Sequence, residues 1–118
     1  MPHPSRRLFV VGTLAALTAA CKGASGAGPV KIGLITALSG QSARSGEAIS
    51  RGLSVAIDEI NAAGGVLGGR KLALVRRDDE SNPARGVTAA RELIHREKVA
   101  VLFGGLDTPV ARARGAAR

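Results

Sequence analysis

Polar residues that could hold a small ligand stand directly after apolar runs in this chain. Ser39 follows the apolar run 30–38, Ser45 opens a stretch with helical spacing, and Thr108 follows the apolar run 99–103 and a pair of glycines. Hydroxyl groups and the free N–H groups of a helix start can hydrogen-bond an anion. Parallel strands would bring all three residues to one end of a sheet, where open α/β sheets bind ligands. The same residues also suit plain turn, helix-cap and loop roles.

No set of residues in the sequence predicts catalysis or a cofactor. Outside the first twenty residues the only histidine is His95, so no Ser-His-Asp or Cys-His arrangement can be assembled. The glycine-rich stretch 64–71 follows a helical pattern, precedes an apolar run and lacks a Gly-Lys-Ser/Thr ending, which excludes a phosphate-binding loop. The acids Asp78–Glu80 lack calcium-loop spacing and indicate a solvated turn before a helix rather than a metal site. We therefore expect neither an enzyme nor a bound cofactor or metal.

The order of apolar runs and helical stretches predicts an α/β fold. Strands are expected near 30–38, 71–77 and 99–103, because short continuous apolar runs are typical of strands buried on both faces. Helices separate them, which gives β-α-β-α-β and a parallel sheet. Asn82 and Pro83 suit the cap and the first position of the second helix.

The first helix is predicted over 45–63 and ends at a glycine pair. Apolar residues recur on one of its faces at helical spacing, and we expect this face to supply most of the core. The face consists of Ile49, Leu53, Ala56, Ile57 and Ile60.

Charge and aromatic content argue against nucleic-acid binding. The formal charge is +8, but five of the 17 basic residues are arginines near the two chain ends, and the chain has two Phe and no Trp or Tyr. It therefore offers no stacking platform for single strands and no concentrated basic footprint. The single cysteine excludes an internal disulfide.

The first 29 residues have the pattern of an export signal and a tether. Residues 1–20 contain two arginines, an apolar stretch and small residues before a cut, and Ser5–Phe9 is similar to a twin-arginine signal. Thr18–Cys21 resembles a bacterial lipobox, which predicts lipid attachment at Cys21; a chance cysteine beside an ordinary cleavage site is the alternative. Residues 21–29 then form the lipid anchor and a flexible tether.

The last residues of the sequence do not continue the pattern of alternating strands and amphipathic helices. Residues 112–118 contain three arginines where a further amphipathic helix would continue, so we expect an irregular, truncated tail. Three strands and two helices leave sheet faces uncovered, and the chain is expected to be the front portion of a larger protein.

Four blocks of sequence are similar to one family, the extracytoplasmic solute-binding proteins of the leucine/isoleucine/valine-binding type. The blocks are KIGLITALSGQSARSGEAISRG, AIDEINAAGGVLGGRKLALVRRDDESNP, the helix containing ARELI, and VLFGGLDT. The resemblance covers about residues 30–111. It implies an incomplete first lobe of a two-lobed periplasmic-binding-protein type 1 fold, with a partial parallel sheet of strand order 2-1-3.

The resemblance also implies a binding site. In such proteins the residue at the position of Thr108 holds the carboxylate of an amino acid, and Leu106 and Asp107 match positions that line the same pocket. Ser45 stands where the family often has a larger residue that contacts the ligand, so the pocket here is expected to be roomier or differently selective. Ser81 and Asp107 match the positions of a disulfide found in some members, and that bridge is absent here.

The function implied is capture of a small solute, an amino acid of branched-chain type, and its delivery to the membrane subunits of an ABC importer. The implied location is periplasmic, or the outer face of the cytoplasmic membrane through the lipid anchor. As this portion alone, the chain is not expected to be competent for binding. The alternative is a ligand-sensing extracellular receptor domain on the same fold.

Overall fold

The computed structural model describes residues 28–115, which form a three-stranded parallel sheet. The strands are β1 (Val30–Thr36), β2 (Leu72–Asp78) and β3 (Val101–Gly104), in the spatial order β2-β1-β3. β1 is central and pairs with β2 along its whole length and with β3 over its middle residues, Ile32 to Ile35. The predicted α/β class and the strand order 2-1-3 are confirmed.

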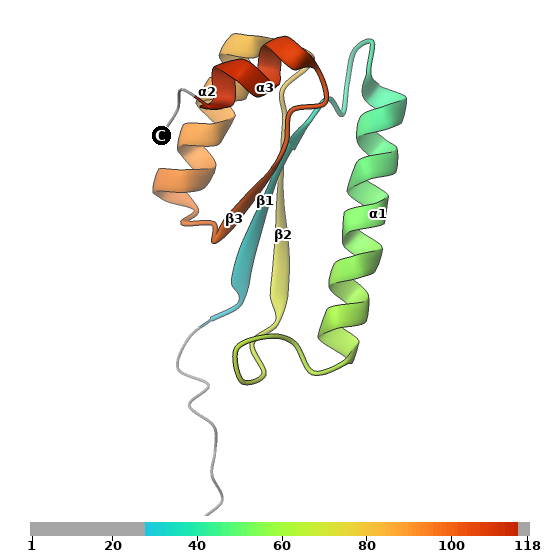
Figure 1. Ribbon diagram of the computed structural model, residues 1–118, viewed down its shortest axis with the longest axis vertical. Coiled ribbons are helices and arrows are strands. Elements are labelled where there is room, and N and C mark those ends of the chain that lie inside the picture. The colour runs from blue at the N-terminus through green and yellow to red at the C-terminus, as the bar shows by residue number, and fades with distance from the viewer. Residues whose placement is uncertain (1–27, 116–118) are drawn as a thin grey trace, which may run out of the picture.

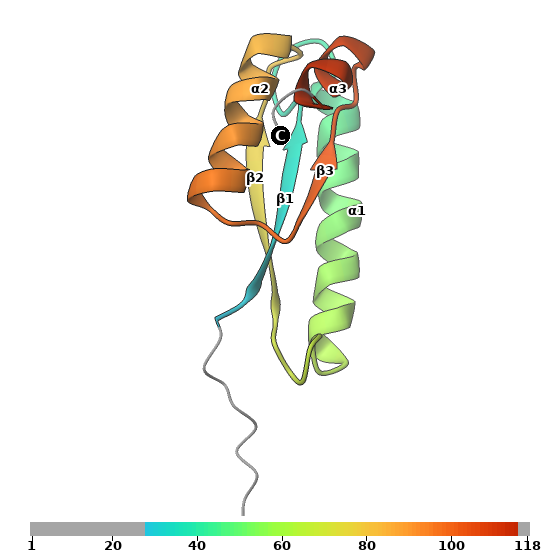
Figure 2. The same ribbon diagram turned by 60° about the vertical axis from the view of Figure 1, so that its left-hand side comes forward.

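Helices cover both faces of the sheet (Figures 1 and 2). α1 (Ala43–Ala62) lies on one face, and α2 (Pro83–Arg91), continued by the π-helical segment η1 (Glu92–Arg96), lies on the other. The first crossover connects β1 to β2 on one side of it, and the second crossover connects β2 to β3 on the other side of β1. Right-handed crossovers in opposite directions place their helices on opposite faces.

The second helix begins as its sequence predicts. The Asn82 side chain accepts hydrogen bonds from the backbone N–H groups of Ala84 (2.9 Å) and Arg85 (3.2 Å), and Pro83 is the first helical residue. The cap satisfies two of the donors that a helix start leaves free, and proline has no N–H to satisfy.

The core lies on the α2 face, which corrects the expectation that the first helix supplies it. Ile35, Ala89, Ala90 and Leu93 form the buried cluster, and partly buried apolar residues pack around them. On α1 the buried residues are Gly46, Ser50 and Ile57, so that Ile57 alone of the predicted face is buried. The predicted apolar face of α1 stays largely open, with Ile49 at 42% and Ile60 at 38% exposure, because α1 covers a narrow sheet whose third strand is short.

A third helix, α3 (Thr108–Gly115), replaces part of the irregular tail expected at 112–118. The reason is a contact that charge patterning does not reveal. Val110 is fully buried against α2, where Gly86 leaves room for it; a Cβ at Gly86 would lie 2.7 Å from Cγ1 of Val110. One buried residue thus holds a helix whose other side chains are mostly polar or small. Residues 116–118 lie outside the described part.

Residues 28–115 contain neither a membrane-spanning helix nor a cluster of metal ligands. None of the helices there is both long enough and apolar enough to cross a membrane. Over the same residues, no three His, Cys, Asp or Glu side chains cluster as metal ligands would. The export signal and Cys21 lie outside the described residues.

Candidate functional site

The loops after β1 and β3 meet at the carboxyl ends of the strands. The hydroxyl of Ser42 donates a hydrogen bond of 3.1 Å to Oδ1 of Asp107. Ser42 is the residue before α1, and Asp107 is the residue before α3. Since β1 and β3 are adjacent strands whose helices leave to opposite faces, this is the point where the strand order reverses, and open α/β sheets bind ligands there.

Two glycines allow the loops to come this close. A Cβ at Gly46 would lie 1.8 Å from the carbonyl oxygen of Ala37, so only glycine lets α1 start against the end of β1. A Cβ at Gly104 would lie 1.8 Å from the carbonyl oxygen of Ile35, and Gly104 has φ of 129°, which favours glycine.

Asp78, the last residue of β2, holds the loop after β1 in place through hydrogen bonds. Its carboxylate accepts hydrogen bonds from the Leu38 N–H (2.9 Å), the Ser39 hydroxyl (2.6 Å) and the Glu80 N–H (2.9 Å). Burial alone would raise the pKa of Asp78, but these hydrogen bonds together outweigh it and lower the pKa below its usual value. Asp78 is therefore a stable anion that positions Ser39.

Asp79 has the opposite environment. It is 1% exposed, and its Oδ1 accepts a hydrogen bond of 2.9 Å from the Ser81 N–H. Burial raises the pKa of Asp79, and the negative charges of Asp107 and Asp78 raise it further, against the hydrogen bond from Ser81. Three carboxylates thus lie at this end of the sheet in unequal environments.

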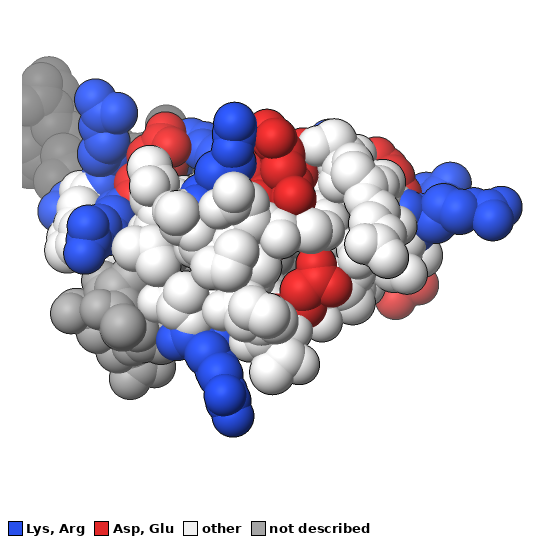
Figure 3. Space-filling view, turned by 90° about the horizontal axis from the view of Figure 1, so that it is seen from above, with Lys and Arg blue, Asp and Glu red and all other residues white. Residues whose placement is uncertain are grey.

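A hollow of about 320 Å³ lies beside the joined loops, lined by Gln41, Ser42, Ser81, Asp107 and Pro109. Oγ of Ser81 is buried without a hydrogen-bond partner within the described chain. Figure 3, which looks onto this end of the molecule, shows acidic side chains reaching the surface between uncharged residues, with several basic side chains projecting at the rim.

The structure places the five sequence-predicted residues at this one end but not in one pocket. Ser39 is exposed and bound to Asp78, Ser45 is exposed in the first turn of α1, and Thr108 is exposed as the first residue of α3. Leu106 is 38% exposed, and Asp107 alone of the five lines the hollow.

Sequence reasoning missed Ser42 and the role of Asp78. Ser42, and not Ser45, stands at the cap position of α1. Its hydroxyl donates a hydrogen bond to Asp107 and does not accept one from the N–H groups of the helix start. A serine just before a helix is a recognisable signal. The sequence predicts a solvated turn at Asp78. Its position at the end of a parallel strand is the signal that could have indicated a role at the site.

Comparison with known families gives a match over most of the chain. Residues 29–117 match the model of a family described as periplasmic binding protein. An amino acid binding protein of Pseudomonas aeruginosa is 36% identical over 102 residues, which is 85% of this chain and 27% of the relative.

Two solved solute-binding proteins are similar to this chain in structure. The branched-chain amino acid transporter substrate binding protein of Streptococcus pneumoniae, in complex with isoleucine, superposes with a TM-score of 0.72 and 32% identity, covering 75% of this chain and 25% of that one. An ABC transporter solute binding protein of Rhodopseudomonas palustris, in complex with 3,4-dihydroxybenzoic acid, gives a TM-score of 0.63 and 32% identity, covering 72% and 23%.

The chain spans about a quarter of the length of these relatives. The match nevertheless covers the whole described sheet and its helices, including both loops of the candidate site. The family is one of solute-binding proteins and not of enzymes. The chain belongs to the periplasmic binding protein family.

Proposed function

We propose that this chain supplies one face of a binding site for a small solute that an ABC importer takes up. The observation that carries the proposal is the Ser42–Asp107 hydrogen bond, which joins the loops after β1 and β3 where the strand order reverses. The start of α1 and the start of α3 flank that bond. Free N–H groups at two helix starts favour an anionic group on the ligand.

The ligand class that fits best is a small carboxylate, and foremost an amino acid of branched-chain type. Isoleucine and 3,4-dihydroxybenzoic acid, the ligands of two similar structures, share a carboxylate. Thr108 stands exposed at the start of α3, where its hydroxyl and N–H can both donate to such a group. Ser39 is exposed on the loop after β1, and Ser45 is exposed in the first turn of α1, at the same end of the sheet.

The proposed face binds weakly by itself because it is open. A hydrogen bond to a charged ligand nets at most about 3 kcal/mol, and a neutral one about 1 kcal/mol. Two such contacts on exposed residues do not exceed the roughly 4 kcal/mol of a millimolar complex after ordering costs. Tight binding needs a second surface that closes over the ligand and excludes water.

Calorimetry on two proteins tests this function. The first is the full chain, and the second is a chimaera in which residues 29–117 replace the matching segment of the Pseudomonas aeruginosa relative. Against isoleucine, leucine, valine and 3,4-dihydroxybenzoate, the chain alone should give a dissociation constant of about a millimolar or weaker. The chimaera should bind at least one of them far more tightly. A chimaera that folds and binds none, or a chain that binds alone at micromolar concentration, would contradict the proposal.

The place of action that we propose is outside the cytoplasm, with lipid on Cys21. The family supports an extracytoplasmic location, and the lipobox-like Thr18–Cys21 supports the anchor. Mass spectrometry of the membrane fraction should find a diacyl-modified Cys21 as the first residue, and Cys21→Ser should release the protein. An unmodified chain that starts elsewhere and washes off the membrane would refute the anchor. We expect no catalytic turnover of the solute.

A further inference from the structure

A basic hollow occupies the other end of the sheet, where β1 begins. It measures about 450 Å³ and contains four basic side chains, Lys31, Arg70, Arg96 and Lys98, against one acid, Glu97. Pro29, Val30, Leu67 and Ala100 complete its lining. We call these nine residues the basic pole.

The positive charge of the basic pole is only partly neutralised. Glu97 already accepts from Lys31 (2.8 Å) and from Arg77 (3.3 Å). Arg96 and Lys98 are exposed, and neither forms an ion pair with another residue of 28–115. The basic pole is therefore a surface of net positive charge that suits phosphate groups.

An apolar side chain projects beside these charges. Leu67 is 75% exposed in the loop between α1 and β2, and its φ of 48° belongs to a tight turn followed by Gly68 and Gly69. An exposed leucine next to lysines and arginines matches what the membrane interface accepts, with the apolar group among the acyl chains and the cations at the headgroups.

The tether leaves the folded part at this pole. Nε of Arg70 donates to the carbonyl oxygen of Gly28 at 3.0 Å, and the N–H of Val30 donates to the carbonyl oxygen of Lys71 at 2.8 Å. The lipid position, residue 21, and that contact, at residue 28, are seven residue steps apart, which span at most about 23–25 Å when fully extended. A lipid on Cys21 would thus keep the basic pole within a short distance of the bilayer.

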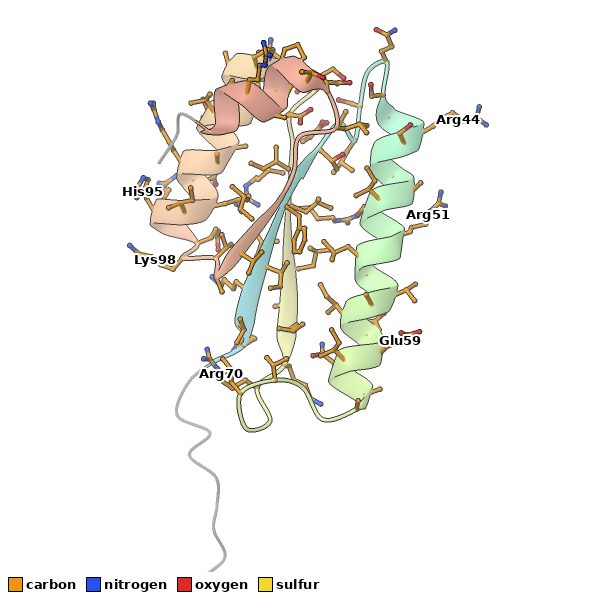
Figure 4. The ribbon with its side chains drawn as sticks, in the orientation of Figure 1. Arg44, Arg51, Glu59, Arg70, His95 and Lys98 are labelled. Carbon is orange, nitrogen blue, oxygen red and sulfur yellow. The ribbon has the colours of Figure 1, made fainter. Side chains whose placement is uncertain are left out.

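We propose that the basic pole docks on the anionic phospholipid headgroups of the membrane that holds the Cys21 lipid; this rests on the anchor proposed above. Docking there turns the opposite end of the sheet, with Ser42 and Asp107, away from the bilayer. In Figure 4 Arg70 and Lys98 point out on one side of the molecule, whereas Arg44 and Arg51 point out from α1 on the other side. Arg44 and Arg51 are therefore matched controls for charge.

A fluorescent label tests the docking in the full, membrane-anchored chain. Ala100→Cys places a thiol-reactive fluorophore in the basic pole, and Gln41→Cys places one at the opposite end. Vesicles carry a headgroup quencher in either phosphatidylcholine alone or phosphatidylcholine with phosphatidylglycerol. The label at Ala100→Cys should be quenched in the anionic vesicles and released at high salt, because salt screens exposed charges. The label at Gln41→Cys should stay unquenched.

Charge variants decide between docking and simple tethering. Each basic residue near an anionic surface is worth about a fivefold change in binding, so Arg96→Glu with Lys98→Glu should weaken docking by at least about 30-fold and abolish the quenching. Arg44→Glu with Arg51→Glu changes the net charge equally and should leave it intact. Equal quenching in both lipids, or equal loss in both double variants, would overturn the proposal.

The same labelling separates failure of the anchor from failure of docking. The unmutated chain has one cysteine, Cys21, and lipid attachment makes it unreactive. If the unmutated chain takes up label, the anchor is wrong, and the docking test is repeated in Cys21→Ser chains added to the vesicles. If it does not, lack of quenching at Ala100→Cys overturns docking alone.

Discussion

Two adjacent carboxylates show how strongly single residues differ at the strand ends. Asp78 is held as an anion by three hydrogen bonds, whereas Asp79 is almost fully buried with one. Their sequence, a pair of acids before Glu80, gives no sign of this difference. It arises because the side chains of successive residues at a strand end point to opposite sides. Asp78 points toward the loop after β1, and Asp79 lies near Gly86 of α2.

Asn substitutions should change stability in opposite directions at these two positions. The pKa of Asp79 is raised in the folded chain, so its contribution to stability is present at acid pH and lost as pH rises through that pKa. The pKa of Asp78 is lowered, so its contribution is present above the ordinary carboxyl range near 3.9 and lost as pH falls. At pH 7 Asp79→Asn should raise the free energy of unfolding and Asp78→Asn should lower it.

Urea unfolding of the parent and both variants between pH 3 and pH 7 measures the differences in the free energy of unfolding. Both differences from the parent should shrink toward the acid end, where the carboxyls are protonated. Two variants that shift stability in the same direction at pH 7 would show that the burial of Asp79 or the hydrogen bonds of Asp78 are misassigned.

Gly46 should be intolerant of a side chain, and Gly52 should not. A Cβ at Gly46 would overlap the carbonyl oxygen of Ala37 at 1.8 Å, so Gly46→Ala must displace the start of α1 and should cost about 1–3 kcal/mol. A Cβ at Gly52 meets nothing within 4 Å, so Gly52→Ala should stabilise α1 by about 0.5–1 kcal/mol. Thermal melts followed by circular dichroism compare the two. A stabilising Gly46→Ala would refute the close contact between α1 and β1.

At the scale of elements, the core cluster that the sequence places on α1 lies on α2 and its continuation η1. Leu93 is fully buried in the core cluster, whereas Ile60 on the predicted apolar face of α1 is 38% exposed. The buried side of α1 contains Ser50, whose hydroxyl accepts a hydrogen bond of 2.9 Å from Nη1 of Arg76. Because a polar residue occupies a buried position there, the spacing of apolar residues does not predict which side of α1 is buried.

Truncating Leu93 should cost much more than truncating Ile60. Leu93→Ala removes a fully buried side chain and should lower the free energy of unfolding by about 3–5 kcal/mol, which can unfold so small a domain. Ile60→Ala removes a half-exposed one and should cost less than about 1 kcal/mol. Leu93→Met, which keeps the volume, should remain folded and allow the comparison. Equal losses for Leu93→Ala and Ile60→Ala would place the core on α1 after all.

The strands and the first two helices were predictable because they depend on local patterns, whereas the strand order followed from the family resemblance. Apolar runs located β1 and β2 to within two residues, and Asn82–Pro83 located the start of α2. β1 stops at Thr36 rather than at residue 38, because the chain turns where Gly46 meets Ala37. α3 was not predictable from apolar spacing, since Val110, beside Gly86, is its only buried apolar residue among those that the structure describes.

The candidate site was predictable only in outline. Its place followed from the rule for strand ends, and the five predicted residues do lie there. The bonds that shape it join residues 39 or more positions apart, Ser39 to Asp78 and Ser42 to Asp107. Such pairings depend on the register of the folded sheet, which apolar spacing does not specify.

At the scale of the whole molecule, the two ends of one sheet carry surfaces of different character. The carboxyl ends of the strands carry the proposed solute face, and the end where β1 begins carries the basic pole beside the tether. The chain spans about a quarter of its relatives, and the proposed face is open. We therefore predict that this face orients the ligand carboxylate when a second surface closes over it.

The most direct test is the affinity of the chimaera after removal of one hydroxyl. Thr108→Val removes the proposed donor to the ligand carboxylate, and Thr88→Val removes an exposed hydroxyl on α2 that bonds only its own helix, at the carbonyl oxygen of Ala84. A hydrogen bond to a charged group is worth about 1.5–3 kcal/mol, so Thr108→Val should weaken binding by roughly ten- to a hundredfold by calorimetry. Thr88→Val should leave binding unchanged. Unaltered affinity in a folded Thr108→Val chimaera would contradict the claim that this face holds the ligand.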